Sequence, residues 1–384
     1  MDRRTFQRGL VALGAAGGAG LALGPDAASA APAGSGPATP DALRSRSLRE
    51  YALPEAGQTH EPVKVPGAPL LLVTQWYPSR LLKLSLDPHT EQVTGLAQFP
   101  LGDDADLPHG LAASTRYPGR IWATLEGAHH LLLLDPAPHS LQAAPRVLRD
   151  IPLPAGGLGP HYVGEYGDLL WVSLKGSNQV LAIDHRHPDR HWFFEARAQP
   201  IFVGRHPVSG ECYASQDKAG SLLRIPFPSG RTTTQIAIPP ERGATPAGVI
   251  ACLDALWVAL LGTEDGGTGS FGRIDEHGRI TWYRLSSPMA RSAGLLHIAF
   301  DPPKSGRGPG LWLLGSSIIS DRVLDLILRV ELDRSHRRIV AEEAVALPTQ
   351  LSKAHRLLVT RRSVFATEMR SSTLAHLEVP QDNR

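Results

Sequence analysis

The sequence predicts an all-β protein built as a seven-bladed β-propeller of four-stranded antiparallel blades. Three observations favour this fold class. Short apolar runs bounded by Gly, Pro, Asp and Asn follow one another along the chain, one unit recurs seven times, and a single strand near residue 48 would complete the last blade. The 384 residues include 38 glycines and 33 prolines, which suits a fold with many turns. No stretch after residue 47 has the periodicity of a long amphipathic helix.

The recurring unit consists of an aromatic residue, a pair of small or β-branched residues, a polar turn and an apolar strand. Clear copies are GRIWATLEGAHHLLLLD, DLLWVSLKGSNQVLAID, GECYASQDKAGSLLRIP, DALWVALLGTEDGGTGSFGRID and RSVFATEMRSSTLAHLE. PLLLVTQWYPSRLLKLSLD and PGLWLLGSSIISDRVLDLILRVELD fit more loosely. A short strand precedes each copy and an outer strand follows it. The resulting period of about 40 to 58 residues is typical of four-stranded propeller blades.

The two ends of the predicted domain fit together. The seventh unit, from His355 to Pro380, supplies three strands, whereas LREYALPEA near residue 48 is a single strand with the pattern of the outer strand VLRDIPLPA. Adding this N-terminal strand to the last blade would close the ring and cover a sheet edge that otherwise invites aggregation. We therefore expect one propeller domain over residues 48–384.

The residues before the propeller predict an export signal and a linker. Residues 1–30 carry paired Arg3 and Arg4, a Gly/Ala/Leu-rich stretch and an A-x-A-type cleavage site after Ala30, which together resemble a twin-arginine signal peptide. A membrane anchor is the alternative, but the apolar stretch is short and glycine-rich for a bilayer span. Residues 31–47 have the composition of a disordered linker. We expect a periplasmic or extracellular protein with no membrane span in its mature form.

The net charge limits the binding partners that we expect, and the two cysteines limit the possible disulfides. The formal net charge of +2 provides no general attraction to nucleic acid or to an acidic membrane. We expect a monomer that takes a small-molecule ligand. Cys212 and Cys252 both lie in apolar strand patterns, which predicts buried packing residues, with a disulfide as the alternative for an exported chain.

The blade pattern also predicts which side chains meet at the central channel. The residue that enters the innermost strand and the residue that leaves the second strand share one end of a blade, because the two strands are antiparallel. His109 and Glu126 are therefore expected to be neighbours at the channel mouth. The entrance positions are His60, His109, His161, Ile201, Ala247, His297 and His355. The exit positions are Trp76, Glu126, Lys175, Asp217, Leu261, Ser316 and Met369, with Glu368 one residue before the last.

Polar members of these two sets fall on the first four blades and the last, while the fifth presents alanine and leucine. A cluster of histidine, carboxylate and lysine beside an apolar wall is typical of a small-molecule site. The alternative for any single histidine is that it belongs to a solvated loop. For the group of His109, Glu126, His161 and Lys175 we favour a functional role.

At these residues the chain resembles the streptogramin B lyase (virginiamycin B lyase) family. Blade phrases such as LWVSLKGSNQVLAID and FGRIDEHGRITWYRL follow the family's pattern, and the resemblance covers residues from about 48 to 380. The tripeptide PHG with His109, and Trp122 followed four residues later by Glu126, match the family's catalytic blade. The resemblance implies a seven-bladed propeller, a lyase activity, His109 as general base and Glu126 as a ligand of Mg²⁺. Leu107 stands where the family has a first acid.

The residue types suit that chemistry. Opening a cyclic ester by elimination removes a Cα proton and expels the ester carboxylate, which needs a base such as histidine. It also needs an electrophile for the developing enolate, a role for Mg²⁺ held by carboxylates and water. Since Leu107 leaves one carboxylate, Lys175 is a second candidate for that positive charge, and His161 joins the catalytic group.

Two other functions stay open. One is a lactone hydrolase on a similar propeller, which would add water where a lyase leaves a double bond. The other is a propeller that binds a ligand or acts as a scaffold without catalysis, since one fold hosts many functions.

A second histidine group, in DHRHPDRHW, is interpreted as a solvated connection. His185, His187 and His191 precede a predicted outer strand, away from the channel. We expect no metal cluster there.

Overall fold

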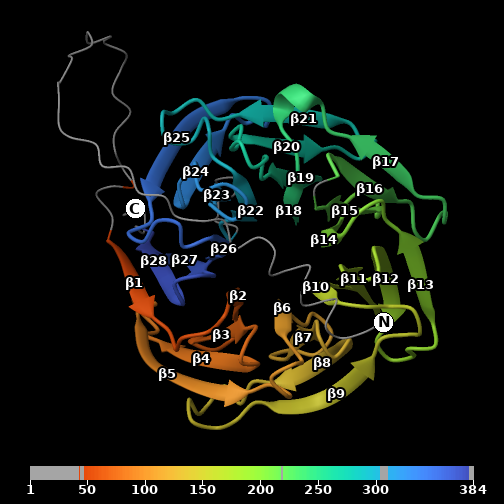
Figure 1. The fold of residues 1–384 in the computed structure, drawn as a ribbon, viewed down its shortest axis with the longest axis vertical. Coiled ribbons are helices and arrows are strands. Elements are labelled where there is room, and N and C mark those ends of the chain that lie inside the picture. The colour runs from red at the N-terminus through yellow and green to blue at the C-terminus, as the bar shows by residue number, and fades with distance from the viewer. Residues whose placement is uncertain (1–42, 44–46, 218, 303–309, 380–384) are drawn as a thin grey trace, which may run out of the picture. The chain divides into compact units, whose positions relative to one another are not determined.

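The computed structural model describes residues 43, 47–217, 219–302 and 310–379. The predicted signal peptide lies outside this part of the chain, as does most of the predicted linker. The described residues form seven four-stranded antiparallel sheets arranged as blades around a ring, together with the single 3-10 turn η1 (Pro240–Arg242) (Figure 1). None of their helices is long and apolar enough to cross a membrane. The predicted fold class is confirmed.

The strands fall into four sets by their position in the blade. The innermost strands are β2 (Thr59–Lys64), β6 (Pro108–Ala113), β10 (Pro160–Tyr166), β14 (Pro200–Arg205), β18 (Pro246–Cys252), β22 (Leu295–Phe300) and β26 (Ala354–Val359). The second strands are β3 (Leu70–Gln75), β7 (Ile121–Leu125), β11 (Leu169–Leu174), β15 (Cys212–Gln216), β19 (Ala255–Leu260), β23 (Leu311–Gly315) and β27 (Ser363–Glu368). The third strands are β4 (Arg80–Leu86), β8 (His130–Asp135), β12 (Gln179–Asp184), β16 (Ser221–Ile225), β20 (Ser270–Ile274), β24 (Leu326–Leu332) and β28 (Thr373–Glu378). The outer strands are β5 (Val93–Pro100), β9 (Arg146–Pro152), β13 (His191–Glu195), β17 (Thr234–Ala237), β21 (Ile280–Arg284), β25 (Ile339–Ala346) and β1 (Leu48–Ala52).

The last blade combines both ends of the described chain. β1 pairs antiparallel with β28, with Leu48 opposite Leu377 and Ala52 opposite Thr373. The innermost strands contact one another in sequence around the ring, and β26 contacts β2. Because β28 would otherwise present an unpaired edge, this pairing covers it.

The recurring aromatic residue explains why the blades pack. Trp122, Trp171, Trp257 and Trp312 are among the largest fully buried side chains. Each lies on a second strand and packs against the next blade; Trp122, for example, contacts the cluster that contains Val163 and donates from Nε1 to the Glu165 carboxylate at 2.8 Å. A buried indole supplies a large apolar surface but needs a partner for its N–H. The sequence repeat is therefore a repeat of interblade contacts.

Two side chains differ from expectation in detail. Both cysteines are unpaired, and Cys212 is buried as predicted, but Cys252 is only half-buried because it ends β18 at the blade margin. Within the predicted linker, Leu43 is 1% exposed and packs between the sixth and seventh blades with Trp312 and Leu357.

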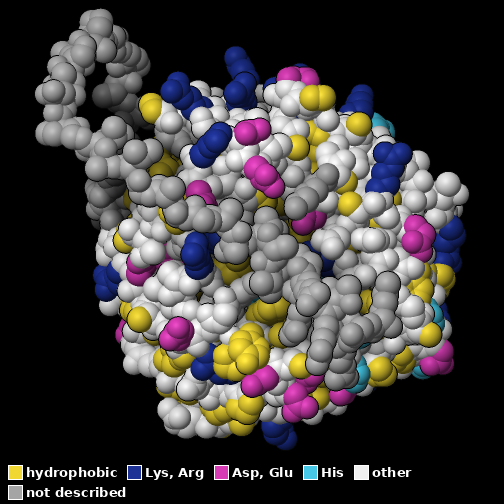
Figure 2. Space-filling model, viewed as in Figure 1, with side chains coloured by type: hydrophobic (Ala, Val, Ile, Leu, Met, Phe, Trp, Pro, Cys, Tyr) yellow, Lys and Arg dark blue, Asp and Glu magenta, His cyan; other side chains and the backbone are white. Residues whose placement is uncertain are grey.

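The surface agrees with the low net charge. On the face shown in Figure 2, Lys and Arg side chains alternate with Asp and Glu, with no broad field of one sign. This gives no electrostatic reason to expect a nucleic-acid partner on that face.

Candidate functional site

One backbone hydrogen bond recurs in every blade and places the entrance and exit residues together. The N–H of each exit residue donates to the carbonyl of the residue just before the innermost strand. The bonds run from Trp76 to Gln58, Glu126 to Leu107, Lys175 to Gly159, Asp217 to Gln199, Leu261 to Thr245, Ser316 to Gly294 and Met369 to Lys353, with N···O distances of 2.8–3.3 Å. The exit residues thus surround the same end of the channel at which the innermost strands begin.

A β-bulge turns the second residue of each innermost strand out of the ladder. In all seven blades the register between the innermost and second strands shifts directly after the first residue, as between Pro108 and Leu111. A bulge of this kind redirects a side chain. It places His60, His109, His161 and His355 in one layer around the channel, together with Ile201, Ala247 and Leu296.

His297 does not belong to this layer, which corrects the prediction. Leu295 pairs with Gly315, so Leu296 is the second residue of β22 and His297 is the third. The sequence pattern placed His297 one residue too early because blade six lacks the Pro or Ala that opens most innermost strands. His297 lies one layer deeper, 5.4 Å from Phe202 between ring centroids.

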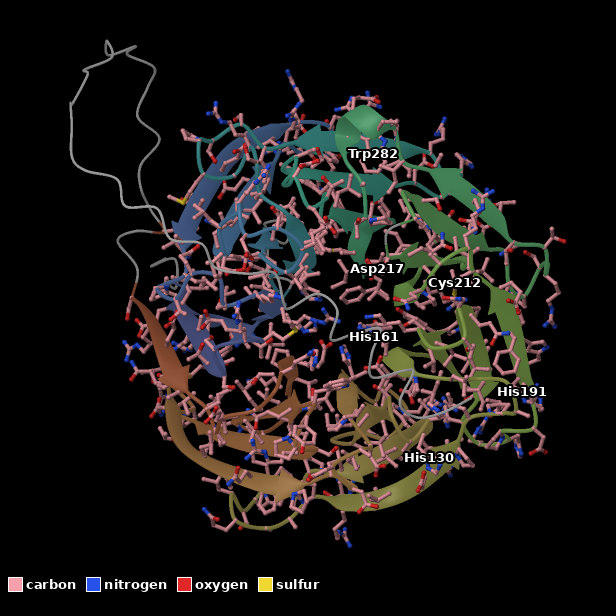
Figure 3. All side chains as sticks on the ribbon, in the orientation of Figure 1. His130, His161, His191, Cys212, Asp217 and Trp282 are labelled. Carbon is pink, nitrogen blue, oxygen red and sulfur yellow. The ribbon has the colours of Figure 1, made fainter. Side chains whose placement is uncertain are left out.

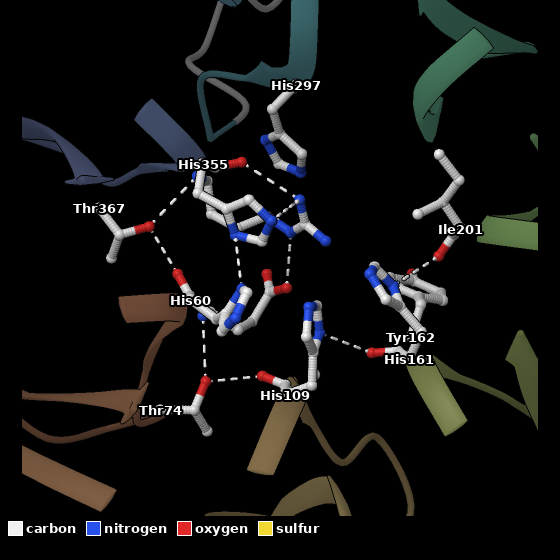
Figure 4. Close-up of polar contacts among 12 residues, drawn as sticks. His60, Thr74, His109, His161, Tyr162, Ile201, His297, His355 and Thr367 are labelled. Carbon is white, nitrogen blue, oxygen red and sulfur yellow. Dashed lines mark hydrogen bonds and ion pairs between the residues drawn. The ribbon is translucent and has the colours of Figure 1, made fainter. Parts of the chain in front are cut away.

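The four histidines of the layer contact one another (Figure 4). Ring centroids are 3.7 Å apart for His109 and His161, 4.1 Å for His60 and His109, and 4.5 Å for His60 and His355. All four are buried, with 2–4% of their surface exposed. Figure 3 shows His161 pointing toward the centre of the ring, whereas His130 and His191 lie near its outer margin.

These imidazoles are neutral at physiological pH. Burial lowers the pKa of His60, His109, His161 and His355 well below the ordinary value of 6.5, and the Arg356 guanidinium lowers each of them further. Nδ1 of His109 lies 2.9 Å from the carbonyl oxygen of His161, and Nδ1 of His161 lies 3.3 Å from that of Ile201. A carbonyl only accepts, so Nδ1 carries the proton in both rings. Their Nε2 atoms therefore keep a lone pair.

Hydroxyl groups on the second strands hold this layer in place. Thr74 Oγ1 accepts from the Glu61 N–H at 3.0 Å and donates to the His109 carbonyl of the next blade at 2.6 Å. Thr124, Ser173 and Thr367 make the same pair of bonds in their blades, and Ser215 accepts from Phe202 N–H. Ala259 and Leu314 occupy this position in blades five and six. Each bridging hydroxyl satisfies backbone groups that the bulge removes from the ladder.

A second layer forms the floor beneath the histidines. Arg356 Nε donates to Glu61 Oε2 at 2.8 Å, and its guanidinium lies 4.2 Å from the Phe202 ring centroid. Phe202 contacts Tyr162 and His297 across the channel. Gly110 stands in this layer because a Cβ there would lie 2.7 Å from the His161 carbonyl. Arg356 and Glu61 were not predicted from the sequence, although each directly follows an entrance histidine.

Glu126 lies at the mouth, as predicted, but its partners are Trp76 and Lys175. Trp76 Nε1 donates to Glu126 Oε2 at 3.2 Å. Burial raises the pKa of Glu126, while Lys175 and the Trp76 N–H oppose that rise. Within the described part of the chain, no hydrogen bond joins Glu126 to His109. The lysine charge also reaches His60 and His161, whose pKa values it lowers.

The remaining exit residues divide the mouth into unlike sectors. Asp217 follows β15 and is half-buried beside the channel. Glu368 is fully buried at the end of β27, where Thr373 donates to its Oε2, and burial raises its pKa to about 7. Opposite, Leu261, Ala247 and Leu296 form an apolar cluster. The apolar wall predicted for blade five thus extends into blade six.

The environment of Glu126 does not fit a magnesium site. Mg²⁺ prefers oxygen ligands in an octahedron and is usually held by one or two carboxylates. Glu126 supplies one carboxylate, and one of its two oxygens accepts from Trp76. The cation beside this carboxylate is Lys175. Leu107 offers no side-chain oxygen, and the Asp106 carboxylate accepts from the Asp103 N–H in its own loop. The reaction proposed below therefore involves no magnesium ion.

His185, His187 and His191, in the connection before β13, have three different environments. His185 is buried rather than solvated, because it packs between Tyr117 and Trp122 with Nε2 3.7 Å from Glu165. His187 is exposed, and His191 Nδ1 donates to the Pro188 carbonyl.

The fold and site define a class: a seven-bladed propeller with a layer of buried histidines near one end of its channel. Among solved structures, virginiamycin B lyase from Staphylococcus aureus is similar, with a TM-score of 0.65 and 17% identity over 87% of this chain and 99% of that one. A catalytically inactive variant of the same lyase, solved with quinupristin, matches with a TM-score of 0.65 and 16% identity over the same shares. YCF48 bound to the D1 peptide matches with a TM-score of 0.58 and 14% identity over 88% of this chain and 97% of that one.

No protein-family model matches the chain, and no curated protein matches it. At these identities the structural likeness shows the fold alone. This chain has the seven-bladed arrangement of the lyases, as the sequence resemblance predicts.

Proposed function

We propose that the protein is an enzyme that opens an ester or lactone-like small molecule by elimination, with His109 as the general base. The observation that carries the proposal is the neutral imidazole of His109, whose tautomer is fixed. Its Nδ1–H is bound to the His161 carbonyl, so its Nε2 lone pair is the one left to accept a proton. The likeness to virginiamycin B lyase supports the same reaction class.

The step balances without a further reagent. His109 Nε2 takes the Cα proton, and the C–H electron pair becomes the new carbon–carbon double bond. The Cβ–O bond breaks, and the oxygen leaves as the carboxylate of the opened ester. A base positioned in this way contributes about 10²- to 10⁴-fold to the rate.

Lys175 supplies the positive charge that the enolate-like transition state needs. It lies close enough to lower the pKa of His161, and Glu126 beside it provides the counter-charge. A cation at the developing charge stabilises the transition state more than the ground state. His161 orients His109 through its carbonyl and through the contact of the two rings, whose planes are tilted by 34°.

The apolar sector supplies a surface for the substrate's hydrocarbon parts. Ala247, Leu261 and Leu296 cluster with Ile318 and Ile319 across from the histidines. Small-molecule sites commonly combine such a wall with a few polar groups. We further propose that the enzyme acts as a monomer outside the cytoplasm, since the segment with Arg3 and Arg4 resembles a twin-arginine signal.

The test is a panel of cyclic depsipeptides, acyclic β-acyloxy esters and lactones, followed by mass spectrometry of the products. Elimination leaves the total mass unchanged and creates a double bond, whereas hydrolysis adds one water. We expect elimination, reduced at least about 10²-fold in His109→Gln. His130→Gln is the matched control, because His130 lies at the blade margin and pairs with Asp150. Hydrolysis products, or equal turnover in His109→Gln, would overturn the proposal.

A further inference from the structure

Three of the four channel histidines converge on one point. One ring nitrogen from each of His60, His109 and His355 lies within 4.8 Å of the other two. The residues come from β2, β6 and β26, which are innermost strands of three consecutive blades. Each occupies the bulge position; hydroxyl bridges hold the carbonyls of His109 and His60, whereas the carbonyl of His355 accepts from Arg356 Nη1. The donors are therefore held by rigid strands rather than by loops.

The hydrogen bonds of these rings leave nitrogen atoms for a ligand. His60 Nδ1 and His355 Nδ1 are 3.2 Å apart, and His355 Nε2 lies 3.5 Å from Arg356 Nη1, so a ligand bond from His355 has to replace one of these two contacts. His60 Nε2 is fully buried, and the described residues give it no partner. His109 donates from Nδ1 to a backbone carbonyl, which is the usual outer contact of a metal-ligating histidine. A buried polar atom without a partner costs about 1–3 kcal/mol, so its presence calls for an explanation.

The charge around the three rings permits a cation. The charges of Arg356 and Lys175 both reach these rings, and Arg356 Nε pairs with Glu61 at 2.8 Å. Burial keeps the imidazoles unprotonated, which is the form that binds metals. A neutral trio next to a neutralised guanidinium does not repel a metal ion as three imidazolium groups would.

We propose that His60, His109 and His355 bind one first-row transition-metal ion, with Zn²⁺ as the representative ion. Imidazole nitrogen suits Zn²⁺, Cu²⁺, Ni²⁺ and iron, whereas Mg²⁺ takes oxygen ligands. Three protein ligands are also the number that catalytic zinc sites use, with water or substrate in the fourth position. The site is separate from the corner of Glu126.

The role of the bound ion rests on the proposed function. Nε2 of His109 would be one of the ligands, and a nitrogen that binds the ion cannot also take the proton of the substrate. Bound Zn²⁺ would therefore block the elimination by His109 rather than assist it. The binding of the ion does not depend on this role.

Binding is tested on the mature full chain without a histidine tag, first freed of metal with a chelator. Calorimetric titration with Zn²⁺ should give one site per chain with a Kd of micromolar or below. Co²⁺ should give the intense visible absorption of a four-coordinate site. Saturation at about 100 times Kd should also raise the free energy of unfolding by about 2.7 kcal/mol.

Two variants and two controls locate the site. His60→Gln and His355→Gln should each weaken Zn²⁺ binding at least about 10²-fold and abolish the Co²⁺ spectrum. His297→Gln and His130→Gln should leave both unchanged, because His297 lies one layer deeper in the same channel and His130 lies at the blade margin, where it pairs with Asp150. Should His60→Gln fail to fold, His355→Gln and the wild-type Co²⁺ spectrum still decide the question. The absence of a stoichiometric site in the wild type, or equal loss in His297→Gln, would overturn the site.

The two proposals fail separately. Elimination activity in chelated protein that binds no Zn²⁺ removes the metal site and keeps the lyase. Stoichiometric binding by a protein that turns over no ester even after chelation keeps the site and removes the lyase.

Discussion

The channel mouth has two unlike sectors on one backbone. Blades seven, one, two and three place His355, His60, His109 and His161 at the bulge position, whereas blades five and six place Ala247 and Leu296 there. The bulge and the exit-residue hydrogen bond are present in both sectors. Only the side chains differ. The comparison shows that the propeller supplies seven equivalent positions and that the sequence uses four consecutive ones for a polar site.

The supporting side chains follow the same division. Thr74, Thr124 and Thr367 carry the bridging hydroxyl beside the histidines, and Ala259 and Leu314 replace it on the apolar side. Below them, Arg356 and Glu61 form a buried ion pair on the polar side. The polar sector is thus two layers deep.

The ion pair gives the largest expected effect. Replacing Arg356 by Met leaves Glu61 buried without its partner, so we expect the protein to lose about 3–5 kcal/mol of stability. The double variant Arg356→Met with Glu61→Gln should recover much of this loss, because no uncompensated charge remains. Urea unfolding of the three proteins measures both steps.

A matched ion pair in blade five provides the control. Arg273 bonds Asp254 at 2.8 Å, but Asp254 is largely exposed. Arg273→Met should cost less than about 1 kcal/mol. Similar losses in Arg273→Met and Arg356→Met would contradict the distinction between the sectors.

The bridging hydroxyls give the next effect. Thr74→Val keeps the shape of the side chain but leaves the Glu61 N–H and the His109 carbonyl unpaired, which should cost about 2–3 kcal/mol. The reverse change, Ala259→Ser, places a hydroxyl at the equivalent position of the apolar sector. We expect this change to be neutral or stabilising, because the new hydroxyl could accept from Gly248 N–H and donate to the Leu296 carbonyl. These two groups correspond to Glu61 N–H and the His109 carbonyl in the polar sector. Thermal unfolding of both variants is the measurement, and a destabilised Ala259→Ser would show that the blades are not equivalent there.

The fold was predictable because its signals are local and repeated. The period-two apolar strands, the turn residues and the interblade aromatic such as Trp122 each recur, so that one blade confirms another. The exit positions were predicted from the same repeat of strands. Trp76, Glu126 and Lys175 lie, as predicted, at the end of the channel where the innermost strands begin. His297 shows the limit: blade six opens on Leu295, and without the opening Pro or Ala the bulge position could not be located.

The partners within the site were not predictable from strand order. Topology places His109 and Glu126 at one end, but their contacts depend on side-chain direction and on neighbouring blades. Glu126 turns to Trp76 of the previous blade and Lys175 of the next. Arg356 pairs with Glu61 of the adjacent blade and contacts Phe202 of blade four, over residue separations that no local pattern encodes. A charged pair directly after His60 and His355 was the one available signal.

Glu368 provides a smaller effect that depends on pH. Burial raises its pKa in the folded protein from 4.5 to about 7. Between these values the unfolded chain releases the proton and the folded chain retains it, so stability falls as pH rises from about 4.5 to 7 and then levels off. Glu368→Gln should remove this fall and gain up to about 3 kcal/mol at pH 8 relative to the wild type, with little difference at pH 4. Unfolding midpoints across this pH range measure it, and parallel curves for the two proteins would contradict the assignment.

The smallest effect concerns magnesium. One carboxylate beside Lys175 should hold Mg²⁺ too weakly to stabilise the fold, since a ligand contributes only when its concentration exceeds its Kd. At millimolar Mg²⁺ we therefore expect no measurable change in the unfolding midpoint of the wild type. Lys175→Met removes the competing charge and should allow a small rise that is lost in the double variant with Glu126→Gln. A rise in the wild type itself, lost in Glu126→Gln, would instead show that Glu126 binds the ion despite its neighbour, and the electrophile of the reaction would have to be reassigned from Lys175.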